Sequence, residues 1–262
     1  MKAARGLKVV DMHCHYLNPA VNQKIAHLNP GQYDPTTVFA DAITRETNVR
    51  QMATRAPRLA GVKERLKDMD KMGIDIQAVC PAPYHFLYWT DRDLGASLTR
   101  EVNDGIAKVV ADTPDRFVGM GSVPLQDADL AVKELDYCVK TLGFRGIEIC
   151  TSVNGRNLTD PDLKLEKFFA RAEELGVVIF MHPLGWTQAD RLTHHYFNNT
   201  GVIWTDTLAL IYGANILHAY SISPDVVTNP DLTGEQKTVS LKLDIINSRT
   251  ESTYLLAINR RF

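Results

Sequence analysis

The chain has 262 residues, of which 45% are hydrophobic and 23% charged, and its formal net charge at pH 7 is −2. This composition is typical of a soluble globular protein, and the near-zero charge gives no electrostatic case for binding nucleic acid or an anionic membrane surface. We expect no signal peptide, because Asp11 interrupts the first apolar run, and no membrane span. The four cysteines contain no C-x-x-C pair, which favours reduced thiols and a cytoplasmic location.

Two histidines, His13 and His15, stand at the end of an apolar run near the N-terminus. A strand is predicted over residues 9–13, and side chains two positions apart on a strand point to the same face. Both imidazoles can therefore reach one metal ion. An isolated His-x-His is equally typical of one turn residue beside one packed residue, so the rest of the chain has to decide between the two.

From residue 7 to about 213 the chain alternates apolar, strand-like runs with amphipathic, helix-like segments. No strand or helix is predicted between the first strand and about residue 57. The predicted strands cover residues 9–13, 74–80, 117–123, 146–151 and 177–181. The predicted helices cover residues 62–72, 92–112, 127–142, 161–175 and 204–212.

Five strand–helix units in series predict a parallel α/β fold, most simply a (β/α) TIM-barrel-like fold. The second, third and fifth strands are nearly continuous apolar runs, as parallel strands covered on both faces should be. In such barrels the chemistry gathers at the C-terminal ends of the strands. His182 follows the fifth strand as His13 and His15 follow the first, so these three residues form the predicted metal site.

Six stretches stand out along the chain in a fixed order: residues 10–15, 69–75, 114–119, 123–126, 142–146 and 180–183. Together they resemble the amidohydrolase-2 family of metal-dependent barrels over about residues 7–213. This family includes aminocarboxymuconate-semialdehyde decarboxylase and related aromatic-acid decarboxylases. The resemblance implies a divalent metal, most often zinc with manganese as the alternative, held by His13, His15 and His182. It also implies an aspartate from the last strand and a histidine from the sixth strand that acts on the substrate.

The family pattern stops after Gly213. The remaining 49 residues, 214–262, contain neither an A-H-G-G-G segment nor a G-T-D-x-P segment, and they cannot hold three more strand–helix units of roughly 30 residues each. We therefore predict an incomplete barrel of about five units over residues 1–213 and a divergent tail over 214–262. Residues 239–245 alternate apolar and polar side chains, which predicts a strand with one exposed face. His218 is a weak candidate for the catalytic histidine.

An aromatic segment, residues 83–89, follows the second predicted strand, where a loop lines the mouth of a barrel site. Phe86 and Trp89 are expected to form an aromatic wall for a planar substrate, with ordinary loop packing as the equal alternative. His85 is expected to be solvent-facing or structural rather than a ligand. By the resemblance, an arginine from the preceding region holds the substrate carboxylate, a task that suits a bidentate guanidinium. We take Arg50 as the candidate, with Arg55 and Arg58 as alternatives, and a solvated surface role is the more common one for any single arginine of this segment.

The leading functional hypothesis is a metal-dependent, non-oxidative decarboxylase of a small aromatic or muconate-type carboxylic acid. Three histidines alone would equally permit hydrolysis of an ester, lactone or amide by metal-bound hydroxide. A third hypothesis is a catalytically inactive family member that lacks the sixth- and eighth-strand residues. Because an open five-stranded sheet exposes its edges, we expect the tail or a second subunit to cover one of them, the second subunit forming a homo-oligomer or a pair with a full-length homologue.

Overall fold

The structure, a computed structural model, describes residues 8–38, 42–182, 238–247 and 250–259. The chain divides into two units, Met1–Thr207 and Leu208–Phe262. The predicted domain boundary at residue 213, the predicted helix over 204–212 and His218 lie outside the described residues and stay predictions. Within the described ranges, no helix is both long enough and apolar enough to cross a membrane.

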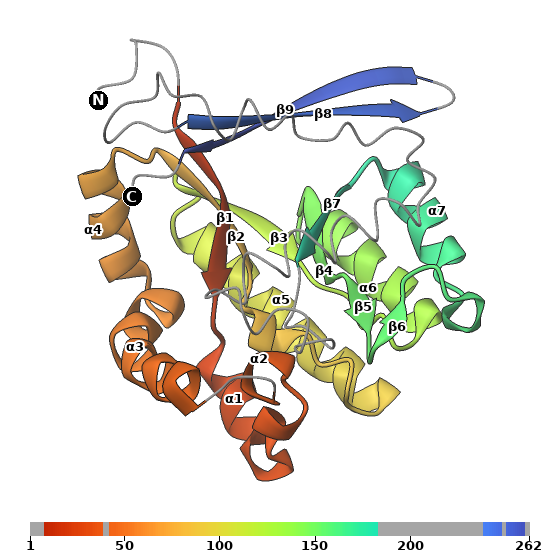
Figure 1. Cartoon of the computed structure of the whole chain (residues 1–262), viewed down its shortest axis with the longest axis horizontal. Coiled ribbons are helices and arrows are strands. Elements are labelled where there is room, and N and C mark those ends of the chain that lie inside the picture. Colours follow the sequence, from red (N-terminus) through yellow and green to blue (C-terminus); the bar gives the residue numbers. More distant parts are fainter. Residues whose placement is uncertain (1–7, 39–41, 183–237, 248–249, 260–262) are drawn as a thin grey trace. The chain divides into compact units, whose positions relative to one another are not determined.

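The first unit is built on a parallel, five-stranded sheet (Figure 1). The order of the strands across the sheet is their order along the chain, with helices in the crossovers, which is the arrangement of half a (β/α) barrel. The prediction of an incomplete barrel is therefore confirmed. The strands are β1 (Val10–Tyr16), β2 (Ile76–Pro81), β3 (Phe117–Gly121), β4 (Gly146–Cys150) and β7 (Val178–His182).

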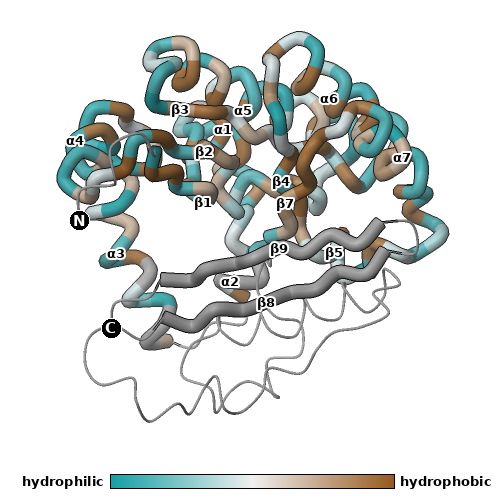
Figure 2. The backbone as a smooth tube through the Cα atoms, turned by 90° about the horizontal axis from the view of Figure 1, so that it is seen from above, coloured by the Kyte–Doolittle hydropathy of each residue, from teal (hydrophilic) through white to brown (hydrophobic). Residues whose placement is uncertain are grey.

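Four amphipathic helices follow or precede these strands close to the predicted positions. Figure 2 shows β3, β4 and β7 as apolar segments and the helices with mixed apolar and polar residues. The longest of the four, α5, packs against β2 and β3, and α6 contacts both α5 and α7. The helices are α4 (Val62–Met72), α5 (Arg92–Asp112), α6 (Ala128–Lys140) and α7 (Glu166–Leu175).

The ends of these helices follow from their capping residues. Asp127 accepts a hydrogen bond from the backbone N–H of Leu130 at 2.9 Å and so begins α6. Gly73 and Gly176, at φ +70° and +61°, end α4 and α7 in the left-handed conformation that glycine adopts without strain. Pro161 does not open a helix as predicted: it opens the 3₁₀ turn Pro161–Leu163, and α7 begins only at Glu166.

The region between β1 and residue 57 differs from the prediction, which placed no element there. It holds α1 (Pro19–Ile25), α2 (Pro35–Val38) and the 19-residue α3 (Ala42–Ala60). The prediction failed because α3 is mostly polar, so that its apolar residues Val49, Met52 and Leu59 form only a sparse stripe, and because Pro57 inside it is typical of a helix end.

The inner face of the sheet carries an apolar cluster below the strand ends. Ala78, Cys80 and Met120 are buried there, and Phe180 packs against them. In β4 the alternation of side chains places Ile147 and Ile149, both fully buried, on the opposite face.

The described part of the second unit is a two-stranded antiparallel pair. It consists of β8 (Thr238–Asn247) and β9 (Thr250–Asn259), with Thr238 opposite Asn259 and Asn247 opposite Thr250. The predicted strand over residues 239–245 lies within β8 and is confirmed as a strand.

Candidate metal centre

The structure brings His13, His15 and His182 together. Their ring centroids are 4.5 Å apart for His13 and His15, 5.2 Å for His13 and His182, and 5.1 Å for His15 and His182. Two of these residues come from β1 and the third from β7, which are the two edges of the five-stranded sheet. In a flat sheet these edges would lie about 19 Å apart, at ~4.8 Å per strand. The sheet is therefore strongly curved, and its edges approach each other where the histidines stand.

A fourth group, Glu148, joins the histidines from β4. One ligand atom from each of the four residues lies within 4.8 Å of the others. The Glu148 side chain is completely buried, and its Oε1 lies 3.7 Å from Nε2 of His13. Neither carboxylate oxygen has a hydrogen-bond partner among the residues that the structure describes. Glu148 is not among the residues predicted from the sequence, where its one distinguishing feature is a carboxylate in the middle of an apolar strand.

The imidazole of His15 is oriented by a backbone carbonyl. Its Nδ1 lies 2.9 Å from the carbonyl oxygen of Pro81. Because a carbonyl oxygen only accepts, Nδ1 carries the proton and donates, and Nε2 keeps the lone pair that a metal requires. Backbone-bonded histidines of this kind are typical of metal sites.

Burial keeps the two β1 histidines neutral. It lowers the pKa of His15 to about 3, helped by the neighbouring imidazoles of His13 and His182 and opposed by the bond to Pro81. Burial also lowers the pKa of His13, against a smaller raising effect of Asp11. Neutral imidazole is the form that binds metal ions.

Burial acts on Glu148 in the opposite direction, raising the pKa of its carboxyl group to about 9. A divalent cation among these groups would reverse that balance, because a nearby positive charge favours the ionised carboxylate. Three neutral imidazoles and one carboxylate form a donor set that suits zinc and is compatible with manganese. The residues present therefore fit the metal that the family resemblance implies.

A buried arginine supports the strand that carries His13 and His15. Arg65, on α4, donates from Nη2 to the carbonyl oxygens of His15 at 2.6 Å and Leu59 at 3.2 Å. Beside it, Gln77 donates to the Asp11 carboxylate at 2.8 Å. These bonds fix β1 against α3, α4 and β2.

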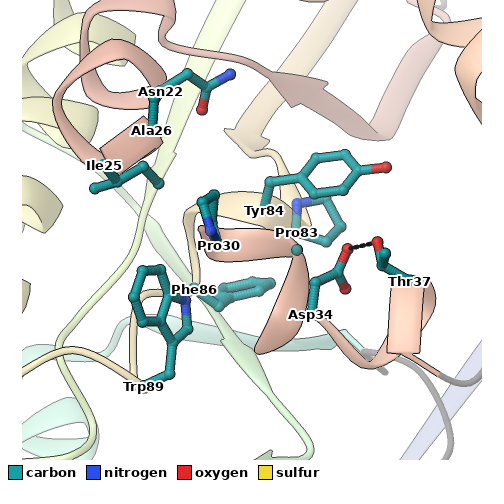
Figure 3. A pocket seen from close by; sticks show the side chains of 11 residues that line it. Asn22, Ile25, Ala26, Pro30, Asp34, Thr37, Pro83, Tyr84, Phe86 and Trp89 are labelled. Atoms are coloured by element: carbon teal, nitrogen blue, oxygen red, sulfur yellow. Dashed lines mark hydrogen bonds between the residues drawn. The ribbon is translucent and has the colours of Figure 1, made fainter. Parts of the chain in front are cut away.

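A cavity of about 420 Å³ lies beside the site, between α1, α2 and the segment after β2 (Figure 3). Tyr84, Phe86 and Trp89 line it, and Trp89 stacks on Tyr33 with ring centroids 4.5 Å apart. The ring of Phe86 is 6.3 Å from that of His182, so Phe86 lies against both the cavity and the histidine cluster. Both predicted aromatic residues therefore line this cavity, and Phe86 also lies near the predicted metal ligand His182.

The other candidate residues are placed as follows. His85 is buried, and its Nε2 is 3.0 Å from Oδ1 of Asn22, which agrees with the structural alternative. Arg50 is exposed on α3 and lines neither this cavity nor a second one of about 400 Å³. Arg45, which is not one of the predicted residues, lines the second cavity. Nε of Arg58 lies 2.7 Å from Oδ2 of Asp68, so Arg58 forms an ion pair. The role of Arg50 stays a prediction.

The amidohydrolase family model (Amidohydro_2) matches residues 10–203, so the chain belongs to this family. It is 36% identical over 132 residues to a 2-amino-3-carboxymuconate-6-semialdehyde decarboxylase of Dictyostelium discoideum, covering 50% of this chain and 36% of that protein. It is 33% identical over 131 residues to a gamma-resorcylate decarboxylase of Rhizobium radiobacter, covering 48% of this chain and 40% of that protein. The chain thus spans well under two thirds of these curated relatives.

The fold agrees with that of a solved decarboxylase. The 5-carboxyvanillate decarboxylase of Novosphingobium aromaticivorans, crystallised with manganese and 4-hydroxy-3-methoxy-5-nitrobenzoic acid, superposes with a TM-score of 0.67. The match covers 80% of this chain and 61% of that chain at 22% identity. At this identity the similarity establishes the shared fold.

Proposed function

We propose that this chain is a metal-dependent, non-oxidative decarboxylase of a small aromatic or muconate-type carboxylic acid. The observation that carries the proposal is the meeting of His13, His15 and His182 at the inner face of a half-barrel of the amidohydrolase family. Several matched relatives are named as decarboxylases of acids of this kind, and another, 27% identical over 192 residues, is a 2-keto-4-carboxy-3-hexenedioate hydratase.

In this proposal His13, His15 and His182 hold a divalent ion, zinc or manganese. When bound, the ion supplies a Lewis acid for the substrate carboxylate or an adjacent oxygen. The bond from His15 to Pro81 keeps the His15 lone pair directed at one place. Phe86, buried between the cavity and His182, excludes water from the side of the site where the substrate ring would lie.

The cavity supports an aromatic substrate. Its volume of about 420 Å³ lies in the range of small-molecule sites, and aromatic side chains on its wall suit a planar ring. Arg50 remains the proposed partner of the substrate carboxylate, and His218 the proposed group for proton transfer.

The cytoplasmic location, and a homo-oligomer or a pair with a full-length homologue, belong to the same proposal. The thiols of Cys14, Cys80 and Cys138 are free, which supports a reducing compartment.

The test is the metal content per chain, by elemental analysis of gel-filtered protein, for the natural chain and the His182→Ala variant. We expect about one zinc or manganese per chain, lost in the variant and kept in His27→Ala, a substitution at an exposed histidine. The metal-loaded protein is then assayed for carbon dioxide release from γ-resorcylate and from 2-amino-3-carboxymuconate 6-semialdehyde. Cleavage of esters or lactones without carbon dioxide release would support the hydrolase instead, and the absence of metal would overturn the site.

A further inference from the structure

We propose that Glu148 is the fourth protein ligand of this metal centre, so that the described half of the barrel provides a complete set of three imidazoles and one carboxylate. The inference rests on the proposed function and adds a ligand to the three predicted from the sequence. The family resemblance of the sequence implies three histidines and a last-strand aspartate as ligands and does not include this residue.

The placement of Glu148 in the sheet aims it at the histidines. In the pairing of β4 with β7, Glu148 lies opposite Phe180, and Cys150 lies opposite His182. Paired residues of neighbouring strands share a face, so Glu148 projects from the same inner face as Phe180, one side-chain position below His182. Phe180 in turn lies 4.9 Å from the ring of His13, measured between centroids. Glu148 therefore forms the floor of the space that the imidazoles surround, and its donor atom lies within 4.8 Å of theirs.

The surroundings of Glu148 are unsuited to a carboxylate unless a cation is present. The side chain has no exposed surface, and neither oxygen has a hydrogen-bond partner among the described residues. Buried carboxylates are strongly disfavoured when they lack a partner, and metal coordination is one of the few arrangements that compensates for the lost water. A divalent ion held only by neutral imidazoles would keep its full charge of about +2, and one carboxylate would reduce it to about +1.

A second buried glutamate shows the contrast within the same molecule. Glu134, on α6, is also buried, but its carboxylate accepts hydrogen bonds from Asn103 at 2.8 Å and lies 2.7 Å from Nη2 of Arg100. The protein thus satisfies one buried carboxylate with its own cation and amide, and surrounds the other with three metal-binding imidazoles.

The experiment measures the dissociation constant for Zn²⁺ by competition with a chromophoric chelator, on the metal-stripped full chain and on Glu148→Gln. Glutamine preserves the shape of the side chain and removes the charge. We expect Zn²⁺ binding to weaken by about 100-fold or more, because even an outer-shell change costs up to about that factor. Glu134→Gln is the matched control, and its affinity for Zn²⁺ should equal that of the natural chain. Circular dichroism checks the folding of each variant, and Glu148→Asp is the second variant if Glu148→Gln does not fold.

A second readout is the visible absorption of the Co²⁺-loaded protein. Four protein ligands favour a four-coordinate ion with intense bands, and loss of the carboxylate should replace that spectrum with a weaker one. Unchanged Zn²⁺ affinity and an unchanged Co²⁺ spectrum in Glu148→Gln, with metal still lost in His182→Ala, would overturn the role of Glu148 and leave the three-histidine site standing. If the natural chain itself bound no metal, the proposed function would fail together with this inference.

Discussion

Nδ1 of His15 and the carbonyl oxygen of Pro81 are 2.9 Å apart, across the pair of strands β1 and β2. This contact fixes which nitrogen of His15 carries the proton. We therefore expect long-range ¹H–¹⁵N NMR spectra at pH 7 to show His15 with a protonated Nδ1 and an unprotonated Nε2, and Zn²⁺ to shift the Nε2 resonance. The spectrum of His15→Gln provides the assignment. A protonated Nε2 in the metal-free protein would contradict the expectation.

Arg65 should matter much more to stability than another arginine of the same region. Replacing Arg65 by methionine removes two hydrogen bonds from a charged donor, to the carbonyl oxygens of His15 and Leu59, and each bond of this kind contributes about 1.5–3 kcal/mol. We expect Arg65→Met to lower the free energy of unfolding in urea by about 3 kcal/mol. The control is Arg58→Met, which removes an exposed ion pair with Asp68 and should cost less than about 1 kcal/mol. Equal effects of the two substitutions would refute this assignment.

Buried His85 predicts a dependence of stability on pH. Burial lowers its pKa to about 4 from the usual 6.5, so between these values the unfolded chain binds more protons than the folded protein. The contribution of His85 to the free energy of unfolding is therefore fully present above pH 6.5. It is lost as the pH falls towards 4, by up to about 3 kcal/mol. In His85→Gln the free energy of unfolding should fall less steeply over this range.

The control for this titration is His27→Gln, at an exposed position of the same region. Its pH profile should follow that of the natural chain. If the profiles of His85→Gln and the natural chain run parallel from pH 7 to pH 4, His85 is not the group responsible.

Trp89 should contribute to binding an aromatic acid and not to binding metal. It lines the cavity and is held by its stack on Tyr33. We expect Trp89→Leu to weaken binding of γ-resorcylate to the metal-loaded protein about tenfold by calorimetry, which corresponds to about 1.4 kcal/mol. Metal content should stay unchanged. The control is Phe169→Leu, at a partly exposed phenylalanine of α7, which should bind the acid as the natural chain does. An unaltered affinity of Trp89→Leu for the acid would mean that Trp89 serves only to pack the loop.

The elements that could be predicted from the sequence are those with a clear apolar period. The bounds of α5 agree with the prediction at both ends, because its buried side chains recur at helical spacing and Asp91 caps its first turn. The bounds of α3 could not be predicted, because its apolar residues are sparse, Pro57 lies inside it, and tertiary contacts such as the bond from Arg65 to Leu59 help to stabilise it.

The site was predictable only as far as its histidines. His13, His15 and His182 follow from the alternation of side chains and from the common direction of parallel strands. Glu148 stands in a strand whose neighbours are buried and apolar, so the local pattern indicates a packed residue. The curvature of the sheet brings Glu148 on β4 close to the histidines of the edge strands β1 and β7, and no local sequence pattern predicts that curvature.

That curvature has a consequence for the mechanics of the fold. Within the described residues, β1 and β7 are the strands whose outer sides lack a neighbour in the sheet, and an ion bound to His13, His15 and His182 would join them. Backbone hydrogen bonds join each strand of the sheet to the next, and the ion would join the two edge strands to each other. Binding to the folded state alone stabilises it, and here the stabilisation would act on the two strands that the backbone leaves least restrained. Their amide exchange with solvent would therefore slow when metal is added, more than that of the central strand β3.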